Sequence, residues 1–194
     1  KFNTRVLTGT AMLAAVATVL MYMEFPIPIM PAFIKLDVSE LPALIASFAY
    51  GPVAGIVVCL IKNLIKLPST STAAVGELFN FVMGALFVGV AGMVYRFKKT
   101  RSGAILGAVL GALVMAIVSV PYNYFIVYPA YVVMYHLPLD AIIGMYQAIN
   151  PNVNGLLNCL LVFHLPFNVF KGMLDAVLCL AICKPLSPIL QGRN

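Results

Sequence analysis

Asn168 and Lys171 place an amide and an ammonium group on one face of a predicted helix. They lie three residues apart in the segment Pro166-Phe-Asn168-Val-Phe-Lys171-Gly172, and side chains at this spacing are neighbours on a helix surface. Together they offer several hydrogen-bond donors and one acceptor. This combination is suited to binding a flat heterocycle that carries carbonyl groups and ring nitrogens.

Two other roles for Lys171 stay open at this point. One is an ion pair with Asp175, which lies one turn further along the same predicted helix. The other is a side chain that extends along the helix so that its charge reaches water. Lys171 belongs to a binding site only if it binds the ligand, and not if it has one of these two other roles.

Asn123 is a further candidate for polar contact with a ligand. It lies in the segment Pro121-Tyr-Asn123-Tyr-Phe, about 30 Å along a helix that starts near Gly103. Tyrosines flank it on both sides, so the alternative is a helix-packing amide inside an aromatic belt at a membrane interface.

Motifs for other chemistries are absent from the sequence. There is no GxxxxGKS/T loop for ATP phosphates and no HExxH or paired His and Cys spacing for a metal. His136 and His164 lie in one stretch, and we interpret them as interfacial polar residues rather than catalysts. The few basic residues fall at the ends of apolar runs, which is unlike a nucleic-acid footprint. We therefore expect no enzyme activity, no metal or cofactor, and no nucleic-acid partner.

The composition is typical of a membrane protein. Hydrophobic residues make up 62% of the chain and charged residues 9%, whereas a soluble domain has about 25% charged residues. Each membrane span needs about 20 apolar residues, so the 194 residues allow roughly six spans. The fold class expected is an all-α integral membrane protein with one membrane domain over residues 1–194.

Apolar runs, prolines and polar loops divide this domain. The segment from Phe25 to Phe33 is rich in proline, which ends a helix, and Tyr50-Gly51-Pro52 interrupts the long apolar run from Leu41 to Leu67. A single span from Leu41 to Leu67 is the alternative to two helices. The predicted helices cover 6–24, 38–49, 52–67, 75–96, 103–133 and 165–184, and the predicted outer loops cover 25–37, 68–74 and 134–164. The last of these loops is expected to hold one or two short helices, which could extend the flanking spans.

The distribution of charge decides between these topologies. With a turn at Gly51 there are six spans, and both termini share one side with the densest basic cluster. That side holds Lys1, Arg5, Arg96, Lys98, Lys99, Arg101, Lys184 and Arg193. The positive-inside rule places this side in the cytoplasm, whereas a single span from 41 to 67 would leave the cluster outside. We therefore predict six transmembrane helices with both termini cytoplasmic, and a polar site near the outer face.

Small residues on the first predicted span repeat every four positions. Thr10, Ala14 and Thr18 form one such row, and Ala11 and Ala15 form another. Such residues let another helix approach closely. The sequence leaves open whether that helix belongs to this chain or to a partner subunit.

Several blocks carry a resemblance to a known family. They are FPIPIMPAFIKLDVSELP (25–42), FAYGPVAGIVVCLIKN (48–63), VGELFNF (75–81), NYF (123–125) and PFNVFKG (166–172). In order and spacing, over nearly the whole chain, they resemble the riboflavin-specific substrate-binding subunits, or S components, of energy-coupling factor (ECF) vitamin importers. The resemblance implies the six-helix S-component fold with both termini cytoplasmic, in the bacterial cell membrane.

The resemblance also implies a site near the outer face, under the loop that joins the first two helices. Asn123, Asn168 and Lys171 would then hydrogen-bond the isoalloxazine ring of the ligand. The residues expected to cover or line the site are Phe33, Ile34, Lys35, Leu36, Ser71 and Thr72, with Tyr124 and Phe167 as further aromatic neighbours. The role of Lys35 stays open, as does binding of flavin mononucleotide in addition to riboflavin.

The function that the resemblance implies is high-affinity capture of riboflavin from outside the cell. Transport would need partners, because the chain has no ATP site. In the family these are a transmembrane coupling subunit and two ATPase subunits, and Ala11 and Ala15 match the contact with the coupling subunit. Two alternatives remain: an S component for another vitamin, and a stand-alone carrier that uses Lys171, Asp175 and Glu77 as a proton relay.

Overall fold

The protein folds as a bundle of long apolar helices. The computed structural model describes residues 3–31, 34–70, 74–136 and 138–191. Within these residues five helices are long and apolar enough to cross a membrane: Thr4–Tyr22, Pro52–Ser69, Val75–Phe97, Arg101–Met134 and Leu156–Ile182. The chain is therefore a multi-pass membrane protein, as its composition predicts.

Nine α-helices and two short strands are assigned in the described residues. They are α1 (Thr4–Tyr22), β1 (Phe25–Pro26), β2 (Lys35–Leu36), α2 (Glu40–Tyr50), α3 (Pro52–Lys66), α4 (Val75–Phe97), α5 (Arg101–Tyr122), α6 (Tyr128–Tyr135), α7 (Leu139–Gln147), α8 (Leu156–Cys159) and α9 (Leu165–Gln191). A 3₁₀ turn (Leu67–Ser69) follows α3, and π-helical turns join α5 to α6 (Asn123–Val127) and α8 to α9 (Leu160–His164). The strands pair as an antiparallel hairpin between α1 and α2.

The break between α2 and α3 lies at Gly51. This glycine has a φ of 105°, a conformation that residues with a Cβ rarely adopt, and Pro52 begins the next helix as proline at N1 often does. A continuous helix from Leu41 to Leu67 is therefore not formed. With only 11 residues, α2 is too short to span a bilayer as a helix alone, and it is not among the five helices that are long enough to cross a membrane.

Residues 134–164 are largely helical, and the last helical run begins before the predicted start. They contain the end of α6, all of α7 and α8, and the π-helical turn, so that the last helical run begins at Leu156 and not at residue 165. Pro166 had suggested a helix start because proline cannot donate a backbone hydrogen bond. The π-helical turn before Pro166 keeps the helical run continuous there, since such turns rearrange the backbone bonds locally.

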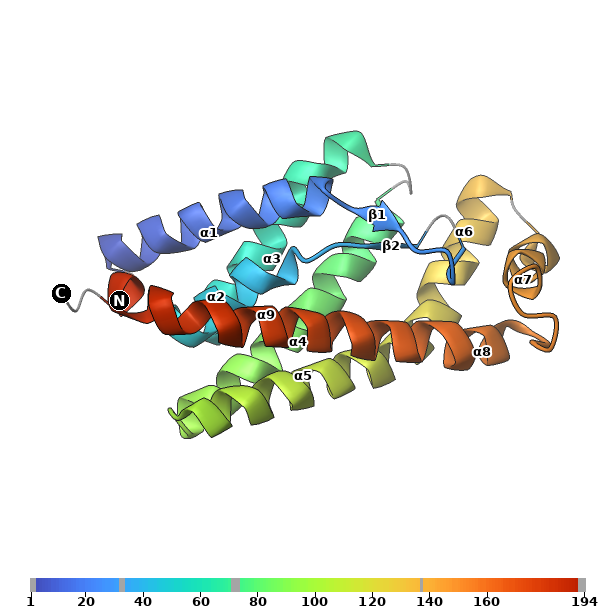
Figure 1. Ribbon diagram of the computed structural model, residues 1–194. Coiled ribbons are helices and arrows are strands. Elements are labelled where there is room, and N and C mark those ends of the chain that lie inside the picture. The colour runs from blue at the N-terminus through green and yellow to red at the C-terminus, as the bar shows by residue number, and fades with distance from the viewer. Residues whose placement is uncertain (1–2, 32–33, 71–73, 137, 192–194) are drawn as a thin grey trace.

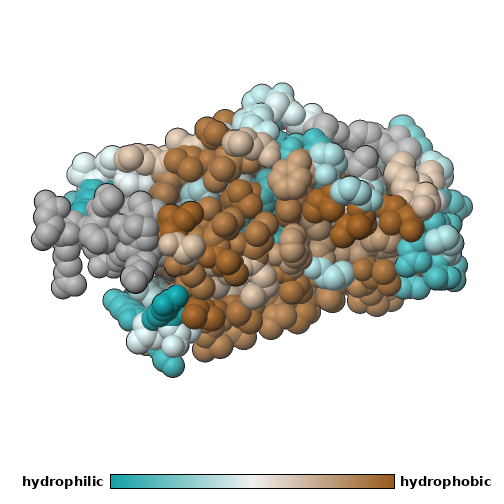
Figure 2. Space-filling view, viewed as in Figure 1, coloured by the Kyte–Doolittle hydropathy of each residue, from teal (hydrophilic) through white to brown (hydrophobic). Residues whose placement is uncertain are grey.

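Both ends of the bundle are polar and its middle is apolar. Figure 1 shows that α1 begins, α9 ends and α4 turns into α5 at one end, whereas α6 and α7 lie at the other. A continuous band of hydrophobic side chains lies between the two ends in Figure 2. Leu7, Met12 and Val19 of α1 are exposed, as expected of side chains that face lipid.

Helices α4 and α5 cross closely at two glycines of α5. A Cβ built on Gly111 would lie 2.5 Å from the carbonyl oxygen of Phe87, and one on Gly107 would lie 2.6 Å from that of Ala91. Both distances are shorter than van der Waals contact, so only glycine permits this approach. The crossing positions the α5 residues that reach the functional site.

Gly111→Ala is expected to lower the midpoint of thermal unfolding by about 3–10 °C, because overpacking a close contact costs about 1–3 kcal/mol. The measurement is thermal unfolding of the purified protein in detergent. Gly144→Ala in α7 is the matched control, since nothing lies within 4 Å of a Cβ at that position. A Gly111→Ala protein as stable as the control would contradict the tight α4–α5 crossing.

Candidate functional site

A cavity of about 310 Å³ lies in the half of the bundle away from the termini. Its volume is at the lower end of the range for small-molecule sites. The hairpin segment between α1 and α2 forms one wall, and α3, α4, α5 with its π-helical turn, α6 and α9 supply the others. The polar residues that line it are Glu24, Lys35, Asp37, Glu40, Lys66, Ser69, Glu77, Asn80, Asn123, Tyr128, Tyr131, His164, Asn168 and Lys171.

The three residues predicted to contact the ligand ring all line this cavity and are buried. The Asn168 amide nitrogen donates to Ser119 Oγ at 3.1 Å and to the carbonyl oxygen of His164 at 2.8 Å. These bonds use both amide hydrogens, so Asn168 retains its oxygen as an acceptor. The Asn123 amide nitrogen donates to the carbonyl oxygen of Ser119 at 2.7 Å. Ser119 therefore orients both amides.

The ammonium group of Lys171 is held by two carboxylates. Its Nζ lies 3.1 Å from Asp37 Oδ2 and 3.0 Å from Glu40 Oε2. The contact with Asp37 is a hydrogen bond and the contact with Glu40 is an ion pair. An ammonium has three hydrogen-bond donors, so at least one is left for a ligand in the cavity.

The alternative ion pair between Lys171 and Asp175 is not formed. Asp175 is completely buried, and within the described residues neither of its carboxyl oxygens has a hydrogen-bond partner. Lys171 also does not extend to water, because its side chain is only 10% exposed. The pairing with Asp37 and Glu40 replaces both of these alternatives.

Asp37 links the hairpin segment to α9. Its Oδ1 accepts hydrogen bonds from the backbone nitrogen and the hydroxyl of Ser39, and its Oδ2 pairs with Lys171. Burial alone would raise the pKa of Asp37, but the charges of Lys171 and Lys62 and the hydrogen bonds from Ser39 hold it well below its usual value. Asp37 is therefore a carboxylate at neutral pH.

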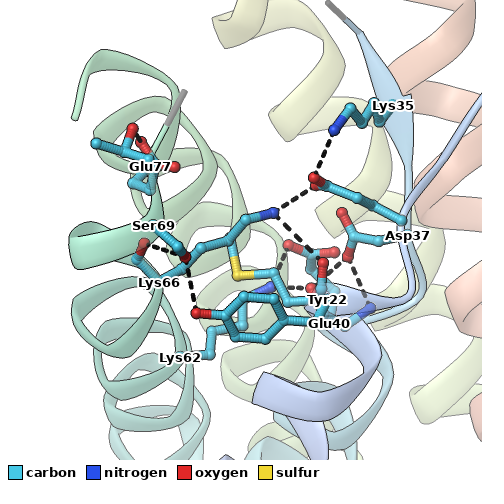
Figure 3. A network of polar contacts seen from close by, with 12 residues as sticks. Tyr22, Lys35, Asp37, Glu40, Lys62, Lys66, Ser69 and Glu77 are labelled. Atoms are coloured by element: carbon cyan, nitrogen blue, oxygen red, sulfur yellow. Dashed lines mark hydrogen bonds and ion pairs between the residues drawn. The ribbon is translucent and has the colours of Figure 1, made fainter. Parts of the chain in front are cut away.

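A second group of charges also lines the cavity and includes Lys35 and Lys66, which are labelled in Figure 3. Glu24 accepts hydrogen bonds from Lys66 and, at 2.8 Å, from Lys35. Burial raises the pKa of Glu24, but these two lysines outweigh that effect and lower it. Tyr22 and Ser69 share a hydrogen bond of 2.8 Å between their hydroxyl groups. This region therefore has hydroxyl, carboxylate and ammonium groups that can hydrogen-bond a flexible polar part of a ligand.

His164 has a different role from the interfacial one predicted for it. It is buried and lines the cavity, and its Nε2 lies 2.9 Å from the Tyr128 hydroxyl and 2.7 Å from the Tyr146 hydroxyl. The two hydroxyls also hydrogen-bond each other. Because Tyr146 belongs to α7, this cluster ties α7 to the cavity wall. His136, by contrast, is exposed after the end of α6.

Some of the remaining predicted site residues line the cavity and others do not. Ile34, Lys35 and Phe167 line the cavity, whereas Leu36 is buried but is not part of the lining. Tyr124 is 39% exposed and does not line the cavity either. Phe33, Ser71 and Thr72 lie outside the described residues.

The two small-residue rows of α1 face in different directions. Thr10 and Ala14 are buried within the bundle, and Thr18 is half-buried. Ala11 and Ala15 are exposed. The first row therefore packs inside this chain, and the second is available to another helix.

Several lining residues were not identified as site residues from the sequence. Glu24, Asp37 and Glu40 were not among the predicted site residues, and Glu77 was named only for the alternative proton relay, although charged groups in apolar surroundings commonly line a functional cavity. A usable signal was the spacing of Lys62 and Lys66, since two lysines one turn apart in an apolar run need buried carboxylate partners.

Comparison with known proteins identifies the family. The family model "ECF transporter, substrate-specific component" matches residues 5–183. The chain belongs to this family. It is thus a transport component and not an enzyme.

Two characterised relatives and one solved structure extend this result to the whole chain. A riboflavin transporter RibU of Staphylococcus aureus is 34% identical over 97% of this chain and 93% of its own length. A riboflavin transporter FmnP of Bacillus subtilis is 32% identical over 97% and 95%. A solved S component of a bacterial ECF transporter superposes with a TM-score of 0.75 at 32% identity, over 96% of this chain and 97% of the other.

Proposed function

We propose that this S component binds riboflavin in the cavity described above and is the riboflavin-specific subunit of an ATP-driven importer in the bacterial cell membrane. The observation that carries the proposal is the convergence of Asn123, Asn168 and Lys171 on one buried cavity. The names of the relatives, riboflavin transporters in both cases, support the same ligand.

The hydrogen-bonding groups of the cavity match the polar edge of a flavin. That edge has an N–H group between two carbonyls. Asn168 retains an acceptor for the N–H group, and Lys171 retains a donor for a carbonyl. The ribityl hydroxyls would face Glu24, Lys66 and Asn80, and Asn80 Oδ1 has no hydrogen-bond partner among the described residues.

Six membrane crossings are proposed, with the short helix α2 in the second of them and the hairpin segment outside the membrane-spanning part. The termini and the basic cluster from Arg96 to Arg101 would then be cytoplasmic, and the cavity would open near the extracellular side. Ile34 and Lys35 would cover the bound flavin, with Phe33, Leu36, Ser71 and Thr72 nearby. Transport would require a transmembrane coupling subunit and two ATPase subunits.

Purified protein tests the ligand directly. The expected result is a yellow preparation, or a colourless one that binds one riboflavin per chain on titration, detected by quenching of flavin fluorescence. If the protein binds thiamin or pyridoxine but does not bind riboflavin, it is an S component for another vitamin. Riboflavin uptake by cells without the ATPase subunits would support the stand-alone carrier instead.

The exposed row of α1 is the proposed contact with the coupling subunit. Replacing both Ala11 and Ala15 with leucine is expected to abolish co-purification with that subunit and reduce uptake more than tenfold, because bulky side chains prevent close helix approach. Riboflavin binding by the isolated subunit should not change. Ala141→Leu, on the exposed face of α7, is the matched control, and a double variant that still co-purifies would contradict this contact.

A further inference from the structure

Lys62 is a buried lysine that the ligand cavity does not use. Its side chain is completely buried in α3, and it is not among the residues that line the cavity. Burying a charged group in an apolar bundle is unfavourable unless it is paired, so its position requires an explanation beyond membrane orientation.

The contacts of Lys62 belong to a closed ring of five residues, three of which (Asp37, Glu40 and Lys62) are labelled in Figure 3. Lys62 donates to Ser39 Oγ, Ser39 donates to Asp37, and Asp37 pairs with Lys171. Lys171 also pairs with Glu40 Oε2, and Glu40 Oε1 accepts from Lys62 at 2.7 Å. Two carboxylates therefore alternate with two ammonium groups, and the ring is electrically balanced.

The ring has one side toward the cavity and one side away from it. Asp37, Glu40 and Lys171 line the cavity, whereas Ser39 and Lys62 do not. Lys62 therefore acts on the ligand site only through its neighbours. Without it, Glu40 and Asp37 would be two buried carboxylates with a single cation, Lys171, to neutralise both.

We propose that Lys62 is a positioning residue for ligand recognition: by neutralising Glu40 from behind, it leaves one ammonium donor of Lys171 free to face the ligand. In the absence of Lys62, Glu40 draws the ammonium of Lys171 toward the carboxylates and away from the cavity. This inference rests on the proposed function, because it assigns Lys171 to the ligand.

A double-mutant cycle with riboflavin as the probe tests this role. Lys62→Met is expected to lower riboflavin affinity at least tenfold in the wild-type background but less than threefold in a Lys171→Met background, because the effect passes through Lys171. Lys66→Met is the matched control: Lys66 lies one turn further along α3 and pairs with Glu24, so its effect should be the same in both backgrounds. Equal losses from Lys62→Met in both backgrounds would overturn the proposal.

A compensated variant separates positioning from a purely structural role. Glu40→Gln combined with Lys62→Met removes both charges of the pair and avoids an unpaired buried charge. Its riboflavin affinity is expected to be within about fivefold of wild type, since Asp37 still holds Lys171. A loss as large as that of Lys171→Met would overturn the proposal, and this measurement remains possible if Lys62→Met alone does not fold.

The absorption spectrum of bound riboflavin gives a readout that reduced folding does not alter. In Lys62→Met the visible bands should shift toward those of the Lys171→Met complex, and in the compensated variant they should return to the wild-type positions. If the absorption bands of riboflavin bound to Lys62→Met stay at the wild-type positions, the proposed role of Lys62 is overturned but the proposed function is not. A wild-type protein that binds no riboflavin would instead contradict the proposed function.

Discussion

Lys171→Met is expected to weaken riboflavin binding about 10- to 100-fold, the scale of losing one hydrogen bond from a charged donor. The ammonium of Lys171 is the one cationic group paired with both Asp37 and Glu40 among the described cavity residues. Its removal deprives the ligand of a donor and leaves more carboxylate than ammonium charge at the cavity wall. Titration of the purified variant with riboflavin, followed by fluorescence quenching, measures the loss.

Asp175→Asn is the matched control on the same helix. Asp175 lies one turn from Lys171 but forms no hydrogen bond with the described residues, so its replacement should change affinity by less than about threefold. Equal losses in the two variants would show that Lys171 depends on Asp175 and not on the pairing with Asp37 and Glu40.

Asn168→Ala is expected to weaken binding by a similar factor, about 10- to 100-fold, for a different reason. Its amide hydrogens are taken by Ser119 and His164, so the variant leaves those acceptors and the N–H group of the flavin without partners. The wild type should therefore bind N3-methylriboflavin at least tenfold more weakly than riboflavin. The variant should bind the two compounds about equally.

Asn158→Ala provides the comparison for this experiment. Asn158 is exposed on the same helical run as Asn168, and its loss should leave both affinities unchanged. A wild-type protein that does not distinguish riboflavin from its N3-methyl analogue would contradict the assignment of the Asn168 oxygen to the flavin N–H group.

Local sequence signals predicted the helix break at Gly51 and the apolar character of the long helices. Glycine and proline determine backbone geometry within a few residues, so Tyr50-Gly51-Pro52 is interpretable without knowledge of the rest of the fold. The start of the last helical run could not be predicted in the same way. At Pro166 the local rule favours a helix start, and only packing of the flanking residues against the bundle selects a π-helical turn and a continuous helix.

The same distinction applies to the site. Asn123, Asn168 and Lys171 were identifiable because polar side chains in apolar runs are rare and usually face an interior. Their partners were not, because the bond between Lys171 and Asp37 joins positions 134 residues apart. No spacing rule predicts such a pair. The bond from Asn168 to Ser119 likewise depends on the crossing of α5 and α9, whereas the bond from Asn123 to Ser119 is local to one helical run.

The two π-helical turns, Asn123–Val127 and Leu160–His164, determine the direction about the helix axis in which the side chains of the following residues point. Each such turn contains one residue more than an α-helical turn would, and one residue corresponds to a rotation of roughly 100° about a helix axis. If the first turn became α-helical without the loss of a residue, Tyr128 and Tyr131 would swing to another face of α6. The lining of the cavity is thus set by the width of this turn as well as by residue type, and a family member with a one-residue gap here would keep the same wall through an ordinary α-helical turn.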